Sequence, residues 1–470
     1  MMLCALALLT LVPVITGDNA GVKVSITQRG LDYAVTNTIK QVLLKMDIPD
    51  HFGTIQVLWI NFDYSFTGMK IHFDNFKSEQ KFVSGTGVSI AVQITNLNVS
   101  GYVTLGRNRT FELFVTTLSI SATVAVKSDR NGHPILNMNE DNCLPEIGQF
   151  KPQIGNRRSI NWILRKITSL FNGFVRTLLK NQICNKLQTL LADLNTQLKT
   201  LKAKVSEYTE IDYSLRSPVV SDNSIEMGLK GVFYNTQQRV EPPSSPPAFS
   251  LASQNTNMFY IAVSAFTINS AFMVLHKTNV FNIRITDDMV PSVSPIRLST
   301  TTFGAFIPQI FETHPDLKLE LKVETVKEPI IKFEPNHVIL QLLSTVTAYD
   351  VQSGNTPTQL FVLNLESVAS VQVSVEEGDL AFNLTLEKIE GSMNGKPFKV
   401  KKNHFLTMIM HNIVFPIIKA HLAKGFQPPG LLGSYIGKVH IINPQVKVLN
   451  DYVLIGTDIE FEENTSSLHH

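Results

Sequence analysis

The stretch "NWILRKITSLFNGFVRTLLKNQIC" (Asn161–Cys184) has apolar side chains every three or four residues, which is the period of an amphipathic helix. The apolar stripe extends beyond this stretch on both sides, over about eleven helical turns. Its members are Ile160, Ile163, Ile167, Leu170, Phe174, Leu178, Ile183, Leu187, Leu190, Leu194, Leu198 and Leu201. The pattern predicts one very long helix, bent at Asn172–Gly173 or broken near Asn185.

Long alternating strands are expected before this helix. In "FELFVTTLSISATVAV" (111–126), Phe111, Leu113 and Val115 share one face, and the apolar period then resumes at Leu118 with shifted phase. The shift predicts a bulge or bend. An earlier helix is expected within "TQRGLDYAVTNTIKQVLLKMDIPD" (27–50), where Pro49 would stop it.

The second half repeats these ingredients. Helices are expected around 299–311 and 403–424, and strands in "LKLELKVETV" (317–326) and on both sides of a turn at 377–379. Between the halves, "QQRVEPPSSPPAFS" (237–250) holds four prolines and reads as an extended linker. The sequence therefore predicts an α+β protein with domains at 18–236 and 251–470.

The first residues, "MMLCALALLTLVPVITG" (1–17), are apolar and uncharged but too short to span a bilayer. They predict a cleaved signal peptide and a secreted, extracellular protein. Cys4 would leave with it, so one disulfide between Cys143 and Cys184 is the economical expectation. Four glycosylation sequons fit secretion. They lie at Asn98, Asn108, Asn383 and Asn464.

Charge is segregated along the chain although the formal net charge is only +2. From Lys151 to Lys204 there are eleven Lys or Arg and a single acid, Asp193. Much of this is compatible with a solvated helix face. Arg157, Arg158, Arg165 and Lys166 instead bracket Trp162, and cations beside an interfacial aromatic suit an anionic lipid headgroup. The small net charge argues against a nucleic-acid partner.

No catalytic or metal-binding motif emerges from the sequence. The nucleophile elbow G-x-S-x-G and the zinc motif H-E-x-x-H are both absent. "GSYIGK" (433–438) imitates a phosphate-binding loop but is one residue short, and Val439 stands where Ser or Thr is required. We therefore expect no enzyme, no metal and no cofactor.

Short segments along nearly the whole mature chain resemble one family, that of bactericidal/permeability-increasing protein. The family includes lipopolysaccharide-binding protein and the plasma phospholipid and cholesteryl ester transfer proteins. The matching segments are "GVKVSITQRGLDYA" (21–34), "IPD" (48–50), "IDYSL" (211–215), "LKGVFY" (229–234), "RITDDMVP" (284–291), "FGAFIPQI" (303–310), "KGFQPP" (424–429) and "VLIGTDIEF" (453–461).

The resemblance implies a boomerang of two tubular lipid-binding domains joined through a central sheet. Each domain would wrap a twisted antiparallel sheet around a long helix and hold phospholipid acyl chains in an apolar pocket. The family's single disulfide joins a strand region to the long helix of the first domain, as Cys143 and Cys184 would. Candidate residues for the first pocket, for which plain core packing is an equal alternative, are Leu31, Val35, Ile39, Leu170, Phe174 and Leu178.

The resemblance also implies a lipid headgroup site at the tip of the first domain, built from three loops. The first loop, "HFGTIQVLW" (51–59), has no Lys or Arg. The second keeps Arg107 and Arg109 around the Asn108 sequon. The third carries the cations that bracket Trp162. This tip is basic but diluted, which predicts binding of phosphorylated glycolipid rather than strong bacterial killing.

Three functional hypotheses follow. The first is a monomeric innate-immunity protein that binds lipopolysaccharide, or related anionic lipid of the bacterial outer membrane, and that could present it to a host receptor. The second is a protein that transfers phospholipid between lipid particles without using the tip cations. The third, a secreted lipase, is disfavoured because the elbow serine is missing.

Overall fold

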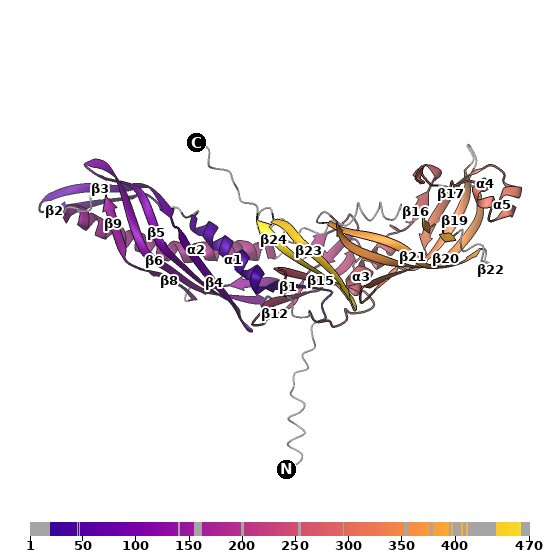
Figure 1. Cartoon of the computed structure of the whole chain (residues 1–470), viewed down its shortest axis with the longest axis horizontal. Helices are drawn as coiled ribbons and strands as arrows, with labels where there is room; N and C mark the ends of the chain where they lie inside the picture. The colour runs from indigo at the N-terminus through magenta and orange to yellow at the C-terminus, as the bar shows by residue number, and fades with distance from the viewer. Residues whose placement is uncertain are drawn as a thin grey trace, which may run out of the picture.

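The computed structural model shows an elongated, gently curved molecule with a sheet at each end and a third sheet between them (Figure 1). It describes residues 19–44, 46, 48–139, 142–154, 162–198, 202–251, 255–294, 296–351, 356–376, 379–393, 396–397, 406–407, 410–411 and 439–461. All strand pairs between the named strands of these sheets are antiparallel. The predicted α+β class is confirmed.

The N-terminal sheet has eight strands and packs against two helices. Its strands are β2 (His51–Val57), β3 (Ile60–His72), β4 (Asn75–Val83), β5 (Gly87–Leu105), β6 (Arg107–Ser128), β7 (Pro134–Asn137), β8 (Cys143–Ile147) and β9 (Phe150–Ile154). The helices are α1 (Gln28–Leu44) and α2 (Trp162–Leu198). One large apolar core lies between this sheet and the helices, and it includes Ile39 of α1, Phe66 of β3 and Phe171 of α2.

β6 carries the predicted change of phase. Its buried positions run through Phe111, Leu113 and Val115 and resume at Leu118, after two half-buried threonines. On the first side of the shift β6 pairs with β9, and on the other it pairs with β8. The irregularity therefore marks the point where one neighbouring strand replaces another.

The long helix is confirmed, but the expected break near Asn185 is wrong, because α2 continues through Asn185 to Leu198. Of its five deepest residues, Ile167 and Ile183 belong to the predicted stripe, and the other three do not. Ile167, Phe171, Val175, Leu179 and Ile183 are at most 1% exposed, and they follow one another at a spacing of four. A stripe about 100° wide contains several such rows, and only contact with the sheet selects the deepest one.

The middle sheet joins both halves of the chain in the order β12-β13-β1-β15-β24-β23. Its strands are β1 (Val22–Thr27), β12 (Leu215–Val220), β13 (Ser224–Leu229), β15 (Phe259–Ser264), β23 (Val439–Leu449) and β24 (Tyr452–Phe461). A small sheet of β10 (Lys202–Lys204), β11 (Thr209–Asp212) and β14 (Val232–Asn235) lies separately. The Pro-rich residues 237–250 form no helix or strand. The domain limits proposed from the sequence stay a prediction.

The C-terminal sheet has seven strands. They are β16 (Ile283–Ile285), β17 (Lys318–Thr325), β18 (Ile330–Glu334), β19 (His337–Val351), β20 (Gln359–Glu376), β21 (Asp379–Met393) and β22 (Lys396–Pro397). The predicted helix at 299–311 is two short helices, α4 (Thr300–Gly304) and α5 (Pro308–Thr313), because Pro308 cannot continue a helix and starts a new one instead. The expected helix at 403–424 lies mostly outside the described residues.

A helix absent from the sequence prediction, α3 (Ala265–Lys277), packs against β14 and β18. Asn269 of α3 donates to the carbonyl of Ile331 and accepts from its amide, at 3.0 and 2.8 Å. The segment is apolar over most of its surface and has no charge before its last turn, so no one-sided stripe marks it in the sequence. Other elements cover a helix of this kind on several sides, so its presence depends on tertiary packing and is not marked by a one-sided apolar stripe.

Candidate functional site

The second and third predicted loops meet at the outer end of the N-terminal sheet. β5 ends at Leu105 and β6 begins at Arg107, and between them Gly106 has a φ of +68°, a turn conformation that glycine adopts readily. β9 pairs with β6 so that Ile154 lies opposite Phe111. The chain therefore leaves β9 close to the β5–β6 turn, and α2 begins soon afterwards.

Arg107 and Arg109 are exposed at this end, and strand alternation sets their direction. They lie on the same face of β6 as Phe111 and Leu113, which point into the core. Asn108 and Thr110 lie on the opposite face. A glycan on Asn108 would therefore project away from the two arginines, so the sequon leaves the cationic face accessible.

Arg165 and Lys166 are exposed in the first turns of α2. Ile167 and Phe171 of the same helix are buried and hold this end of α2 on the sheet, where Phe171 stacks on Phe66 with ring centroids 3.8 Å apart. Trp162 is the first residue of α2, but its side chain lies outside the described part, as do Arg157 and Arg158 entirely. The structure thus brings Arg107, Arg109, Arg165 and Lys166 to the same end of the domain.

Arg176, farther along α2, has a structural role. Its guanidinium donates to the carbonyl oxygens of Ile147 and Gly148, at 2.9 and 3.1 Å, and lies 5.0 Å from the centroid of the Phe150 ring. It therefore fastens the β8–β9 turn to α2.

Aromatic rings fill the interior just below the tip. Phe111 contacts Phe66 and Phe171 edge-to-face, with centroids 5.0 and 5.3 Å apart, and His51 stacks on Phe174 at 4.2 Å. Burial lowers the pKa of His51 below its usual value, so the neutral imidazole is favoured in this aromatic setting. Phe66, Phe111 and Phe171 are almost fully buried, so the interior next to the cationic tip is an aromatic core.

The six predicted pocket residues do not form one wall. Ile39 belongs to the main core, while Leu31 lies in a separate cluster with Phe82 and Val88, and Val35 touches both. Phe174 and Leu178 pack against the main core and are partly buried. Leu170 is 50% exposed and faces away from the interior, so it is wrong as a pocket residue. The helix turns Phe171 inward in its place.

A small apolar cavity lies in the other half of the molecule. It has a volume of about 10 Å³ and is lined by residues including Phe303, Val346 and Leu363, with Leu406 and Met410 on another side. This is roughly the space of one water molecule.

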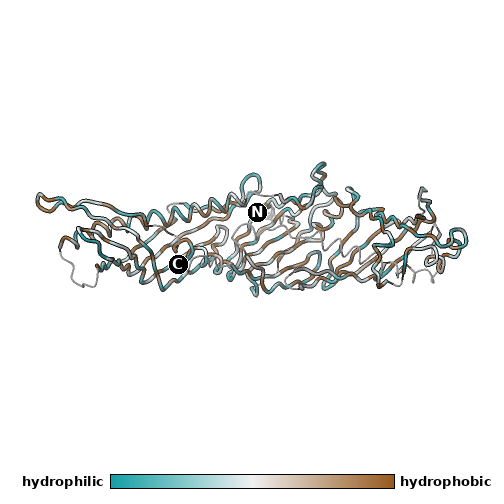
Figure 2. The backbone as a smooth tube through the Cα atoms, turned by 90° about the horizontal axis from the view of Figure 1, so that it is seen from above, coloured by the Kyte–Doolittle hydropathy of each residue, from teal (hydrophilic) through white to brown (hydrophobic). Residues whose placement is uncertain are grey.

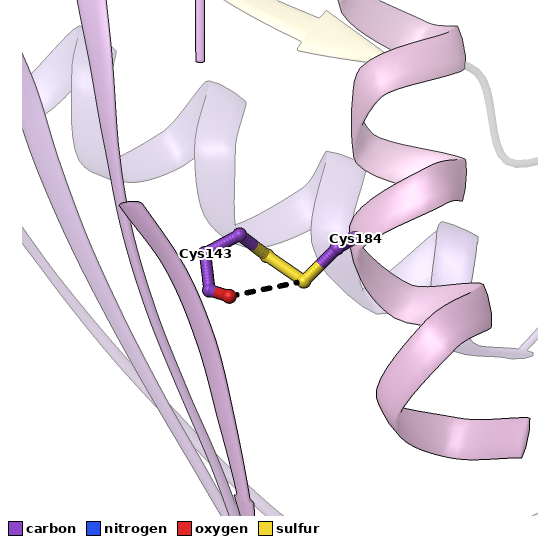
Figure 3. Close-up of a disulfide and its surroundings, with 2 residues drawn as sticks. All are labelled: Cys143 and Cys184. Atoms are coloured by element: carbon purple, nitrogen blue, oxygen red, sulfur yellow. Dashed lines mark hydrogen bonds between the residues drawn. A yellow bond between two sulfur atoms is a disulfide. The ribbon is translucent and has the colours of Figure 1, made fainter. Parts of the chain in front are cut away.

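The predicted disulfide between Cys143 and Cys184 is confirmed and ties β8 to α2 (Figure 3). The two Cα atoms lie 6.0 Å apart, and Cys184 Sγ is 3.4 Å from the carbonyl oxygen of Cys143. Cys143 is buried among Ala122, Val124 and Met138. The bond therefore crosses the interface on which α2 rests.

The four sequons have different settings. Asn108 and Asn383 are exposed on β6 and β21, whereas Asn98 is half-buried in the middle of β5, opposite Phe114. Asn464 lies outside the described residues. Glycosylation of all four stays a prediction.

The end of the β2–β3 hairpin was missed as a candidate site. Leu58, Trp59 and Ile60 are 75%, 85% and 53% exposed at the end of the molecule. The absence of Lys and Arg from this loop was visible in the sequence, but its exposure was not. In the helices that the structure describes, no segment is long and apolar enough to cross a membrane.

Sequence models of both domains of one family match the chain. The N-terminal domain model of the LBP / BPI / CETP family matches residues 30–194, and the C-terminal domain model matches residues 203–461. The protein thus belongs to the LBP / BPI / CETP family, whose fold combines two domains of curled antiparallel sheet.

Individual relatives agree with this assignment. The chain is 40% identical to the bactericidal permeability-increasing protein of Sebastes schlegelii, covering 97% of this chain and 99% of that protein. It is 26% identical to the lipopolysaccharide-binding protein of Mus musculus, over 95% and 94% of the two chains. A crystal structure of lipopolysaccharide binding protein superposes with a TM-score of 0.58 at 24% identity, covering 95% of this chain and all of that one, which supports the fold.

Proposed function

We propose that the protein is a secreted, extracellular lipid-binding protein of innate immunity. It binds lipopolysaccharide, or a related anionic bacterial lipid, through the cationic tip of its N-terminal domain. The observation that carries the proposal is the placement of Arg107 and Arg109, which are exposed on the same face of β6 as the apolar core residues Phe111 and Leu113. The names of the relatives and the family membership support the same lipid class.

Amphiphilic ligands need two kinds of contact, and the proposed site offers both. Guanidinium groups can hold a phosphate through charge-assisted hydrogen bonds, and the set of tip residues is Arg107, Arg109, Arg157, Arg158, Trp162, Arg165 and Lys166. Beneath them the aromatic interior provides an apolar setting for acyl chains. Phospholipid in apolar pockets of both domains, a host receptor as partner and a monomeric state belong to the same proposal.

The tip assignment is tested by a charge-matched pair of double variants. Arg107→Ala with Arg109→Ala should weaken binding of lipopolysaccharide roughly thirtyfold at a stated, moderate salt concentration, since each of the two charge-assisted contacts contributes about 1 kcal/mol at an exposed site. Lys180→Ala with Lys186→Ala removes the same charge from exposed positions of α2 that lie at least fourteen residues beyond Lys166, or about 21 Å along the helix. This control should bind like the parent.

Titration by calorimetry or fluorescence at two salt concentrations provides the measurement. Equal losses in both double variants would show a general effect of charge and contradict the tip assignment. Transfer of labelled phospholipid between vesicles that is rapid in both variants would instead favour the transfer alternative.

A further inference from the structure

The β2–β3 hairpin forms the outermost part of the N-terminal end (Figure 1). β3 pairs with β5 only from Ser65 onward, so its first five residues, Ile60 to Tyr64, pair with β2 alone. At about 3.4 Å per residue, the hairpin extends roughly 17 Å past the last described pair between β3 and β5. The β2–β3 turn is therefore the part of the tip that would contact a binding surface first.

One face of the hairpin packs on the main core of the domain, and this packing holds the hairpin in place. Ile55 is buried in the main core, and Val57 and Phe62 pack against that core. These residues hold the hairpin at the end of the domain. Beyond them, Leu58, Trp59 and Ile60 are exposed at the turn, together with the polar Asn61.

The turn is apolar and uncharged. No Lys, Arg, Asp or Glu occurs from Ile55 to Phe62. Figure 2 shows the apolar colouring at this outermost end of the tube. Exposed apolar residues scattered singly are ordinary, but three in succession at the end of a projecting hairpin form one apolar tip.

The composition of the turn is not explained by turn formation. Val57 pairs with Ile60, which leaves a loop of two residues, Leu58 and Trp59. Such loops favour Asn-Gly or Asp-Gly because they need positive φ angles. Leu58 has a φ of +55°, a conformation that a branched aliphatic side chain rarely adopts. If this turn served only to close the hairpin, we would expect Asn, Asp or Gly in place of Leu58 and Trp59.

The shape and charge of this tip fit a lipid layer better than a protein partner. A convex end of three side chains offers too little surface for a stable protein interface, which takes roughly 800 Å² from each partner. A fluid lipid layer can close around such an end. Tryptophan prefers the boundary between headgroups and acyl chains, and Arg107 and Arg109 at the neighbouring hairpin end suit anionic headgroups.

We propose that the β2–β3 turn inserts Leu58, Trp59 and Ile60 into the boundary region of an anionic lipid bilayer. The insertion goes beyond the proposed lipopolysaccharide site, because it uses apolar side chains and a bilayer rather than phosphate contacts. The charged residue nearest the turn in the hairpin, Asp63, does not oppose it: Thr54 Oγ1 donates to its carboxylate at 2.6 Å, on the outward face below the tip.

The first experiment uses Trp59 as its own reporter. The chain has only two tryptophans, so Trp162→Phe in the full-length protein leaves Trp59 alone and keeps an aromatic ring at the other position. On addition of vesicles of phosphatidylglycerol and phosphatidylcholine, the Trp59 emission should shift to shorter wavelength and be quenched by lipids brominated near the headgroup. Emission that stays unshifted and unquenched with vesicles in excess overturns the proposal, whether or not the protein binds them.

The second experiment replaces the turn by one that closes hairpins well. Leu58→Gly with Trp59→Asn places glycine at the one loop position with positive φ, so the fold and melting temperature should be kept or improved. Binding to the same vesicles should fall at least roughly tenfold, the effect of losing about 1.4 kcal/mol of apolar burial. Val293→Asn, at a position 91% exposed in the other half of the chain, is the control and should bind vesicles like the parent.

Unchanged vesicle binding by the Gly-Asn variant would overturn the proposal. The outcomes separate this inference from the lipopolysaccharide site. Loss of Arg107 and Arg109 should weaken lipopolysaccharide binding and leave the emission shift of Trp59 measurable at low salt. Loss of the apolar turn should weaken vesicle binding at least roughly tenfold and leave lipopolysaccharide binding through the arginines unchanged.

Discussion

At the residue scale, a buried acid shows how the Pro-rich stretch is fastened to the rest of the molecule. Asp212 of β11 is 8% exposed and receives Arg239 Nη2 at 2.6 Å, while Lys230 Nζ lies 3.8 Å away. The Arg239 guanidinium also covers the ring of Tyr234 at 3.9 Å. Burial alone would raise the pKa of Asp212, but hydrogen bonds from Ser214 and Arg239 and the charge of Lys230 outweigh it and lower the pKa.

Arg239→Ala should therefore lower the free energy of unfolding by about 1–2 kcal/mol at neutral pH, a figure reduced for the partial exposure of Arg239. Because the folded pKa of Asp212 is depressed, its contribution is present above the ordinary carboxyl pKa and is lost as pH falls through the folded value. The difference between parent and variant should shrink in acid. Denaturant unfolding at neutral and acidic pH measures this, with the exposed Arg130→Ala as control. A difference independent of pH would contradict the role of Asp212.

At the element scale, α2 is attached to the sheet at two places beyond its packing. The disulfide joins it to β8, and the Asn195 side chain pairs with the backbone of Leu136, accepting from the amide at 2.8 Å and donating to the carbonyl at 2.7 Å. The helix is 37 residues long, and its second half has few fully buried residues after Ile183. These two attachments therefore matter most for the second half of the helix.

Replacing both Cys143 and Cys184 by Ala should lower the stability by about 2–4 kcal/mol, since the bond closes a loop whose ends are 41 residues apart. The second half of α2 should lose protection from amide hydrogen exchange before the central strands β5 and β6 do. Hydrogen exchange followed by mass spectrometry tests this order. Uniform loss of protection over the whole N-terminal domain would show that the disulfide does not act locally.

At the scale of the whole molecule, the start of α1 couples the two halves of the chain. Arg29 forms an ion pair with Asp458 at 3.2 Å, and Asp458 also accepts from the amide of Met258 at 2.8 Å. The Met258 carbonyl accepts from the amide and the hydroxyl of Thr27, both at 3.1 Å. Gly30 packs directly on that carbonyl, where a Cβ would collide with the oxygen.

Gly30→Ala should therefore destabilise the protein by roughly 1–3 kcal/mol, although alanine favours helices, because the clash falls on backbone of the other half. Gly173→Ala is the matched control: it lies in α2 with open space around it, and it should stabilise by up to about 1 kcal/mol. Calorimetric melting of both variants gives the comparison. A stabilised Gly30 variant would show that the two halves are not held together at this point.

Elements with a regular apolar period could be predicted from the amino-acid sequence. The alternation in β6 and the apolar stripe of α2 were readable because each element packs on one side only, and the compartment and cysteine count identified the Cys143–Cys184 bond. The cations of the tip could be named because they cluster along the chain. α3 has no one-sided stripe to predict it because it is apolar on most sides. The apolar period of 299–311 predicts one helix because it continues across Pro308, where the structure begins a second helix.

Contacts between distant segments determine which side of each element faces the interior and which end is exposed to solvent. A periodic stripe does not say that Phe171 is buried while Leu170 is half-exposed, since the sheet selects the row on which the helix rests. Likewise, "VLWI" (57–60) reads as ordinary apolar strand. Its exposure arises because β5 and β6 turn back before the β2–β3 hairpin ends, a relation between segments more than forty residues apart.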